Sequence, residues 1–206
     1  AHRPPKSTKL LAVSKTKPVS DIVQAYEVGQ RLFAENYAQE AVEKIHELQK
    51  FEDIEWHFIG PLQSNKTRLV AENFDWVHTV DRLKIAERLN TQASPGKILN
   101  VCIQINIDED ENKAGIAANQ LQELANNIAA LPNLTLRGIM TIPKANQPIS
   151  KLNDSFATMA RLYTDLQTQY STVDTLSLGM SADMKCAINH GSTMVRIGSA
   201  IFGSRT

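Results

Sequence analysis

Short apolar runs alternate with longer amphipathic runs along the whole chain, and this alternation limits the fold more than any other feature. The apolar runs are rich in β-branched residues and have the length of strands, whereas the amphipathic runs have the periodicity of helices with one apolar face. Strands that alternate with helices predict a parallel sheet, because each parallel strand needs a crossover to bring the chain back.

Eight such strands fit within the 206 residues. The predicted strands are residues 10–13, 31–34, 55–58, 76–79, 99–105, 136–140, 175–178 and 194–197. The predicted helices are residues 20–28, 38–48, 64–73, 82–89, 119–130, 152–169 and 183–190. Ser20 and Ser64 stand at the starts of two helices, where each hydroxyl is expected to accept a hydrogen bond from a backbone N–H of the first turn.

Eight strand–helix units in roughly 200 residues match the lower size limit of a (β/α)8 TIM barrel. This leaves no length for a second domain, so residues 1–206 are expected to form one domain. A doubly wound open sheet is the alternative fold. In a barrel, functional sites are built by the loops that follow the strands, so the informative residues are those at the C-terminal ends of the strands.

The composition excludes several functional classes. Twenty-two basic and twenty-two acidic residues leave no net charge, so no overall attraction to nucleic acid or to an anionic membrane is expected. Cys102 and Cys186 lie in apolar segments without the spacing of a zinc site or a disulfide framework, and no metal site is predicted. No apolar run is long enough to span a bilayer. A cytoplasmic protein fits these features best.

Lys15 follows the first predicted strand directly, and its position suggests a chemical role. A lysine at this point of a barrel can lie in a partly desolvated pocket, which favours the neutral amine and makes it nucleophilic towards carbonyl groups. The alternative is an ordinary solvated lysine. Lys17 would share the same side of the strand, but it stands beside Pro18 and is expected to point outside.

Small polar residues and glycine follow the seventh and eighth predicted strands. The corresponding loops of many barrels bind phosphate through backbone N–H groups and small hydroxyl side chains. Ser181 and Ser199 supply hydroxyls, and Gly198 allows the backbone to approach an anion without a Cβ in the way. The alternative for either loop alone is an ordinary turn, but two such loops in the expected positions favour a phosphate site.

Arg196 lies within the otherwise apolar last strand, where an unpaired guanidinium would be costly to bury. It needs either a buried salt bridge or an acceptor atom on a ligand. The pyridine nitrogen of pyridoxal 5′-phosphate (PLP) is such an atom. A Schiff-base lysine, a phosphate site and an inward arginine together indicate PLP, whereas none of them does so alone. His57, His78 and His190 are interpreted as hydrogen-bonded core residues.

Specific motifs throughout the chain resemble the pyridoxal phosphate homeostasis protein family. They are LLAVSKTKP (10–18), ENYAQE (35–40), WHFIGPLQSNK (56–66), HTVDR (78–82), RGIMTIP (137–143), LSLGMSADM (176–184) and GSTMVRIGSAIFG (191–203). The resemblance implies an alanine-racemase-like barrel of PLP fold type III. It also implies that PLP forms an aldimine with Lys15, that Asn36 lies near the cofactor and that Arg196 faces the pyridine nitrogen. By the same matching, Ser181, Gly198 and Ser199 hold the phosphate.

The resemblance further implies a protein of vitamin B6 homeostasis that holds PLP without dedicated catalysis, with apo PLP-dependent enzymes as candidate recipients. Members of the family usually begin with a helix before the first strand, so the N-terminal helix is expected to be missing here. The chain ends at Thr206 directly after the barrel, so we expect it to lack the C-terminal β-domain of the racemases and to be a monomer. The alternatives are a racemase-like PLP enzyme and a Schiff-base phosphosugar aldolase.

Overall fold

Eight parallel strands close into a barrel in the computed structural model, which describes residue 4 and residues 7–203. The strands follow one another around the barrel in chain order, and β1 pairs with β8 to close it. Their bounds are β1 Lys9–Val13, β2 Leu32–Glu35, β3 Glu55–Phe58, β4 Trp76–Val80, β5 Leu99–Gln104, β6 Leu134–Met140, β7 Thr175–Ser177 and β8 Met194–Ile197. The (β/α)8 barrel is thus confirmed, and the open sheet is excluded.

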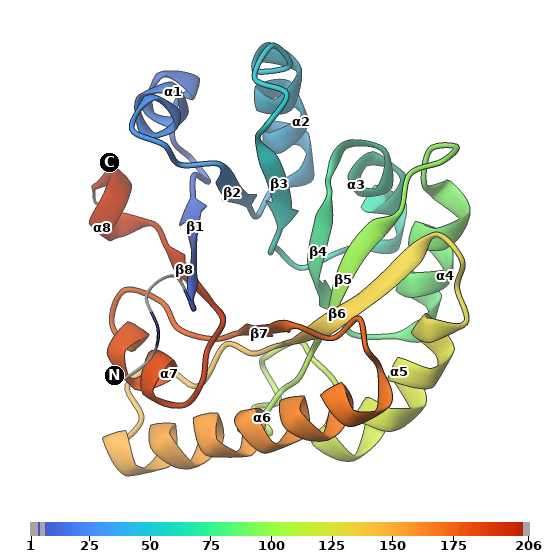
Figure 1. Cartoon of the computed structure of the whole chain (residues 1–206), viewed down its shortest axis with the longest axis vertical. Helices are drawn as coiled ribbons and strands as arrows, with labels where there is room; N and C mark the ends of the chain where they lie inside the picture. Colours follow the sequence, from blue (N-terminus) through green and yellow to red (C-terminus); the bar gives the residue numbers. More distant parts are fainter. Residues whose placement is uncertain (1–3, 5–6, 204–206) are drawn as a thin grey trace.

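Helices surround the strands, as Figure 1 shows. The α-helices are α1 Val19–Glu27, α2 Ala38–Glu47, α3 Thr67–Asn73, α4 Leu83–Gln92, α5 Leu121–Ala129, α6 Ile149–Gln169, α7 Met184–Asn189 and α8 Ser199–Phe202. Short 3-10 turns, η1 Ser64–Lys66 and η2 Ala118–Gln120, lead into α3 and α5. Every predicted strand and helix is present, with bounds that differ by at most three residues.

The two predicted serine caps are wrong. Helix α1 begins after Pro18, so Ser20 already lies within its first turn and its hydroxyl does not cap the helix. Pro18 has φ −68° and ψ 158°, which directs the chain into the helix without a side-chain hydrogen bond. Ser64 is the first residue of the 3-10 turn η1, and Gln63 precedes it at the cap position without a side-chain bond.

Apolar side chains fill two regions of the fold. The larger core lies between the barrel and its helices and contains, among others, Phe33, Phe58 and Phe156. Two smaller clusters lie on the alternate, inward-facing positions of the strands. One consists of Leu11, Ala34, Ile59 and Met194, and the other of Trp76, Cys102 and Met140. The inside of the barrel is therefore packed, and a ligand can bind only at its ends.

Two further observations concern the ends of the chain and membranes. The prediction that an N-terminal helix is missing concerns the segment before β1. Residues 1–3 and 5–6 of this segment lie outside the described residues, so the statement stays a prediction.

Within the part of the chain that the structure describes, no helix combines the length and the apolar character needed to cross a bilayer.

Candidate functional site

A pocket of about 370 Å³ lies at the C-terminal ends of β1, β2 and β8. All six residues predicted from the sequence line it, namely Lys15, Asn36, Ser181, Arg196, Gly198 and Ser199. The rest of the lining consists of Val13, Lys17, Ile59, Ile142, Met180, Ala182 and Gly203. A cavity of this size, mostly apolar with a few convergent polar groups, is typical of a site for a small ligand or cofactor.

Lys15 lies in a tight turn that follows β1 and is fixed from outside the barrel. Thr16, the next residue, has a positive φ of 61°. Its backbone N–H donates a hydrogen bond of 2.6 Å to Oε1 of Glu40 on α2. On the other side of Lys15, the carbonyl oxygen of Ser14 accepts a bond of 2.8 Å from Nζ of Lys44. Both neighbours of Lys15 are thus held by side chains of α2, which limits the movement of the lysine.

A buried ion pair anchors this turn. Glu35, at the end of β2, is fully buried, and its Oε1 accepts hydrogen bonds from Lys44 Nζ at 2.9 Å and from Ser14 Oγ at 2.7 Å. Lys44 is only 7% exposed, and its Nζ also lies 2.6 Å from Oε1 of Glu40. Burial raises the pKa of Glu35, and the neighbouring ammonium of Lys44 opposes this rise. The pair therefore stabilises the turn only while both partners are present.

Asn36 follows β2 and contributes an amide to the pocket. Its Oδ1 is buried and makes no hydrogen bond with the described residues. The backbone of Asn36 is held in place by Gly60, because a Cβ on Gly60 would lie 1.9 Å from the Asn36 carbonyl oxygen. Buried amide oxygens almost always have a donor, so the free Oδ1 marks a place where a ligand can supply one.

The two serines of the predicted phosphate site lie together at one side of the pocket. Ser181 Oγ and Ser199 Oγ are 3.4 Å apart, although Ser181 lies in the loop after β7 and Ser199 begins α8 after β8. Gly198 packs closely against β1, since a Cβ at this position would lie 3.2 Å from the carbonyl oxygen of Val13. Two adjacent exposed hydroxyls beside a glycine suit the binding of a phosphate group.

Arg196 is 3% exposed and points from β8 to the floor of the pocket. Its Nη1 donates to the carbonyl oxygen of Ser177 at 2.8 Å and to Ser177 Oγ at 2.7 Å. Its Nη2 donates to the carbonyl oxygen of Thr141 at 2.8 Å. Burial lowers the pKa of Arg196 to about 10, so the guanidinium stays charged at neutral pH. No carboxylate among the described residues pairs with it, and the buried salt bridge considered above is not formed.

The structure corrects the prediction for Lys17, which lines the pocket instead of pointing outside. The alternation of a strand could not have shown this, because residues 15 and 16 form a turn after β1 in which Thr16 has a positive φ. The apolar lining by Ile59, Ile142 and Met180 was not predicted. His57 and His78 are fully buried and hydrogen-bonded, as expected of core histidines.

Comparison with known proteins agrees with this geometry. The model of the family "Alanine racemase, N-terminal domain" matches residues 1–206. A curated relative from Pasteurella multocida (strain Pm70), named "Pyridoxal phosphate homeostasis protein", is 55% identical over 209 residues, which cover 100% of this chain and 90% of the relative. The chain belongs to the pyridoxal phosphate homeostasis protein family.

Solved structures of this family and its wider relatives have the same fold. PipY of Synechococcus elongatus PCC7942, solved with PLP bound, has a TM-score of 0.88 and 36% identity over 98% of this chain and 95% of PipY. An alanine racemase of Clostridium difficile 630 has a TM-score of 0.76 and 17% identity, and the match covers 98% of this chain but 54% of the racemase. The racemase supports the fold alone. Because the chain belongs to the homeostasis family, the alternative of a Schiff-base phosphosugar aldolase is not needed to explain the pocket.

Proposed function

We propose that this protein binds PLP in the pocket beside Lys15, as an imine with the Lys15 amine, and serves the homeostasis of PLP in the cytoplasm. The observation that carries the proposal is the convergence of Lys15, Arg196, Ser181 and Ser199 on one pocket of about 370 Å³. The PLP-bound structure of PipY, a relative with 36% identity, supports it.

The residues of the pocket fit the parts of PLP. The cofactor supplies an aldehyde, a phosphate and a pyridine ring, for which the pocket offers an amine, a pair of hydroxyls and a buried guanidinium. Ser181 and Ser199, with Gly198 between the strand and α8, would hold the phosphate. Arg196 would donate a hydrogen bond to the ring nitrogen, since its bonds to Ser177 and Thr141 use three of its five N–H groups. The unpaired Oδ1 of Asn36 offers an acceptor near the ring.

The titratable groups of the pocket favour a holding role over catalysis. Apart from Lys15, Lys17 and Arg196, no described residue of the lining carries a titratable side chain. Racemisation and transamination need groups that move protons at the substrate carbon, and beside the two lysines no histidine, carboxylate, tyrosine or cysteine stands among the described lining residues. We therefore propose that the pocket binds, shields and releases the cofactor, with apo PLP-dependent enzymes as recipients. We further propose that the protein acts as a monomer.

The experiment that tests this function maps the covalent bond. PLP is added to the purified protein, the visible spectrum is recorded, the imine is reduced with borohydride, and the modified peptide is identified by mass spectrometry. We expect one stable label on Lys15. A colourless protein with scattered labels on surface lysines would contradict the proposal, and a single label on Lys17 would move the site to the neighbouring residue.

Substitution of Arg196 by alanine is expected to change the spectrum of bound PLP and to weaken its affinity, because the ring nitrogen loses its donor. The protein also loses the donor for the carbonyl groups of Ser177 and Thr141, so stability should fall by about 1–3 kcal/mol for each buried carbonyl left unpaired. Absorption spectroscopy and urea unfolding measure the two effects. Arg161→Ala, on the exposed side of α6, is the matched control. An unchanged spectrum and affinity in a folded Arg196→Ala protein would refute the role of Arg196.

A further inference from the structure

A continuous line of hydrogen bonds crosses the inside of the barrel from its N-terminal end to the pocket. Glu55 Oε1 lies 2.9 Å from His57 Nε2, and His57 Nδ1 lies 2.9 Å from His78 Nε2. His78 Nδ1 lies 3.1 Å from Ser177 Oγ, which accepts a bond of 2.7 Å from Arg196 Nη1. We call these five residues the interior chain. It joins strands β3, β4, β7 and β8, and its last member lines the pocket.

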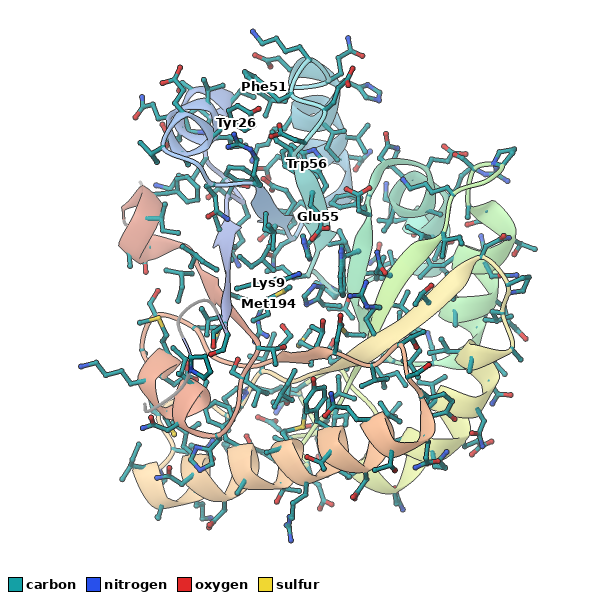
Figure 2. All side chains as sticks on the ribbon, in the orientation of Figure 1. Lys9, Tyr26, Phe51, Glu55, Trp56 and Met194 are labelled. Atoms are coloured by element: carbon teal, nitrogen blue, oxygen red, sulfur yellow. The ribbon has the colours of Figure 1, made fainter. Side chains whose placement is uncertain are left out.

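The two ends of the interior chain lie at opposite ends of the barrel. Glu55 is the first residue of β3, and its side chain is 38% exposed. In Figure 2, Glu55 lies near Lys9 and Met194, the first residues of β1 and β8, at the centre of the view. His57, His78 and Ser177 have no exposed surface, and Arg196 is 3% exposed. Of the five residues of the interior chain, only Glu55 reaches solvent at the N-terminal end of the barrel.

One arrangement of protons satisfies all four contacts. A guanidinium only donates, so Ser177 Oγ accepts from Arg196 and its own O–H is available to donate to Nδ1 of His78. At the other end, the carboxylate of Glu55 only accepts, so His57 must carry its proton on Nε2. Nδ1 of His57 then accepts from His78, which must also carry its proton on Nε2. Every N–H or O–H group that donates within the interior chain therefore points away from Arg196 and towards Glu55.

The surroundings of the two imidazoles agree with this arrangement, in which both rings are neutral. Burial lowers the pKa of His57, and burial together with the positive charge of Arg196 lowers the pKa of His78 well below its usual value. Burial alone would raise the pKa of Glu55, but the hydrogen bond from His57 and the charge of Lys9 hold it below its usual value. Trp76 stacks on His57 with ring centroids 5.2 Å apart and so fixes the plane of that ring.

We propose that Glu55, His57 and His78 are positioning residues for the pocket, because they fix the direction of the hydrogen bond between Ser177 and Arg196. The carboxylate of Glu55 selects the Nε2–H form of both histidines, and this form turns the Ser177 hydroxyl towards His78 and leaves its lone pairs for Arg196. The guanidinium is thereby held on the pocket floor. Binding in the pocket and the state of Glu55 are thus coupled, and thermodynamic linkage makes the coupling act in both directions.

The first test needs no ligand. Long-range proton–nitrogen NMR correlations distinguish the two neutral forms of each histidine in the purified protein. At neutral pH, we expect His57 and His78 to show only the Nε2–H form. Glu55→Gln replaces the acceptor by a group that both donates and accepts, so the Nδ1–H form should appear in at least one of the two rings. The control Glu52→Gln changes an exposed glutamate three residues earlier and should leave both rings unchanged. An Nδ1–H form of His78 in the unmodified protein would overturn the proposal.

The second test rests on the proposed PLP function and distinguishes the binding of PLP from the coupling through the interior chain. His57 does not line the pocket, yet addition of PLP should shift its ring nitrogen signals through the interior chain. Ser177→Ala should remove that shift while PLP still binds, with an affinity about threefold to tenfold weaker. Failure of PLP to bind the unmodified protein would contradict the proposed function and leave the NMR test of the histidines standing. Normal PLP binding without a response at His57 would overturn the coupling.

Discussion

Lys15→Ala is expected to abolish the visible absorption of the PLP complex and its fixation by borohydride. Lys15 lines the pocket, and its turn is held by the bonds from Lys44 to the Ser14 carbonyl and from the Thr16 N–H to Glu40. An amine fixed in this way meets the aldehyde of a bound cofactor at a high effective concentration. The phosphate and ring contacts remain in the variant, so PLP should still bind reversibly but with at least tenfold lower affinity. Absorption titration and mass spectrometry of the reduced protein measure both effects.

Two comparison variants sharpen this result. Lys84→Ala, on the exposed face of α4, should behave as the unmodified protein because it lies outside the pocket. Lys17→Ala removes the other amine of the lining and should weaken binding without removing the covalent label. If Lys15→Ala retained a borohydride label within the pocket and Lys17→Ala lost it, the assignment of the imine to Lys15 would be wrong.

Lys44→Met is expected to lower the free energy of unfolding by about 3–5 kcal/mol, the usual cost of removing one partner of a buried ion pair. Lys44 is 7% exposed and Glu35 is fully buried, so the variant leaves a carboxylate without its cation in the core. It also releases the carbonyl of Ser14 and thus one side of the Lys15 turn. Urea unfolding measures the loss of stability, and PLP titration measures the effect on the turn.

The pH dependence of the free energy of unfolding distinguishes the loss of the Glu35–Lys44 ion pair from a simple loss of packing. Burial raises the pKa of Glu35 above its ordinary value, and removal of Lys44 removes a group that lowers it. A carboxyl group whose pKa is raised in the folded state favours folding when protonated, and this contribution is lost as the pH rises through that pKa. The loss of stability in Lys44→Met should therefore become smaller as the pH falls from 8 towards the raised pKa of Glu35. The double variant Glu35→Gln/Lys44→Met should recover much of the stability at pH 8, whereas a deficit independent of pH would contradict the ion-pair explanation.

The sequence predicted the strands well because their apolar, β-branched runs are local signals. The bounds of β3 and β8 agree with the predicted ranges 55–58 and 194–197. Helix starts were less predictable, since Pro18 sets the start of α1 by backbone geometry and displaces the cap expected at Ser20. Local patterns identify an element, but the residue at which it begins depends on the backbone around it.

Of the pocket, the sequence predicted six lining residues and missed Lys17, the apolar lining and the groups that hold the lining in place. Lys15 and Arg196 were identified because each is unusual in its own segment. The pair of Glu35 with Lys44 and the contact of His57 with His78 join different strands and helices, and no local pattern shows such contacts. His57 and His78 were predicted as buried, but the direction of their hydrogen bonds depends on Glu55 and Ser177, which only the closed barrel brings together.

Closure of the barrel at the β1–β8 pair has a consequence for the synthesis of the protein. Lys15 and Asn36 come from the first strands, whereas Ser181 and Arg196 come from the last, and the pairing of Leu11 with Arg196 joins the two groups. A chain still emerging from the ribosome therefore has Lys15 long before it has Ser181 and Arg196. The whole pocket can form only after β8 has been made and has paired with β1, so a ligand bound there would mark a closed barrel and would oppose separation of these two strands.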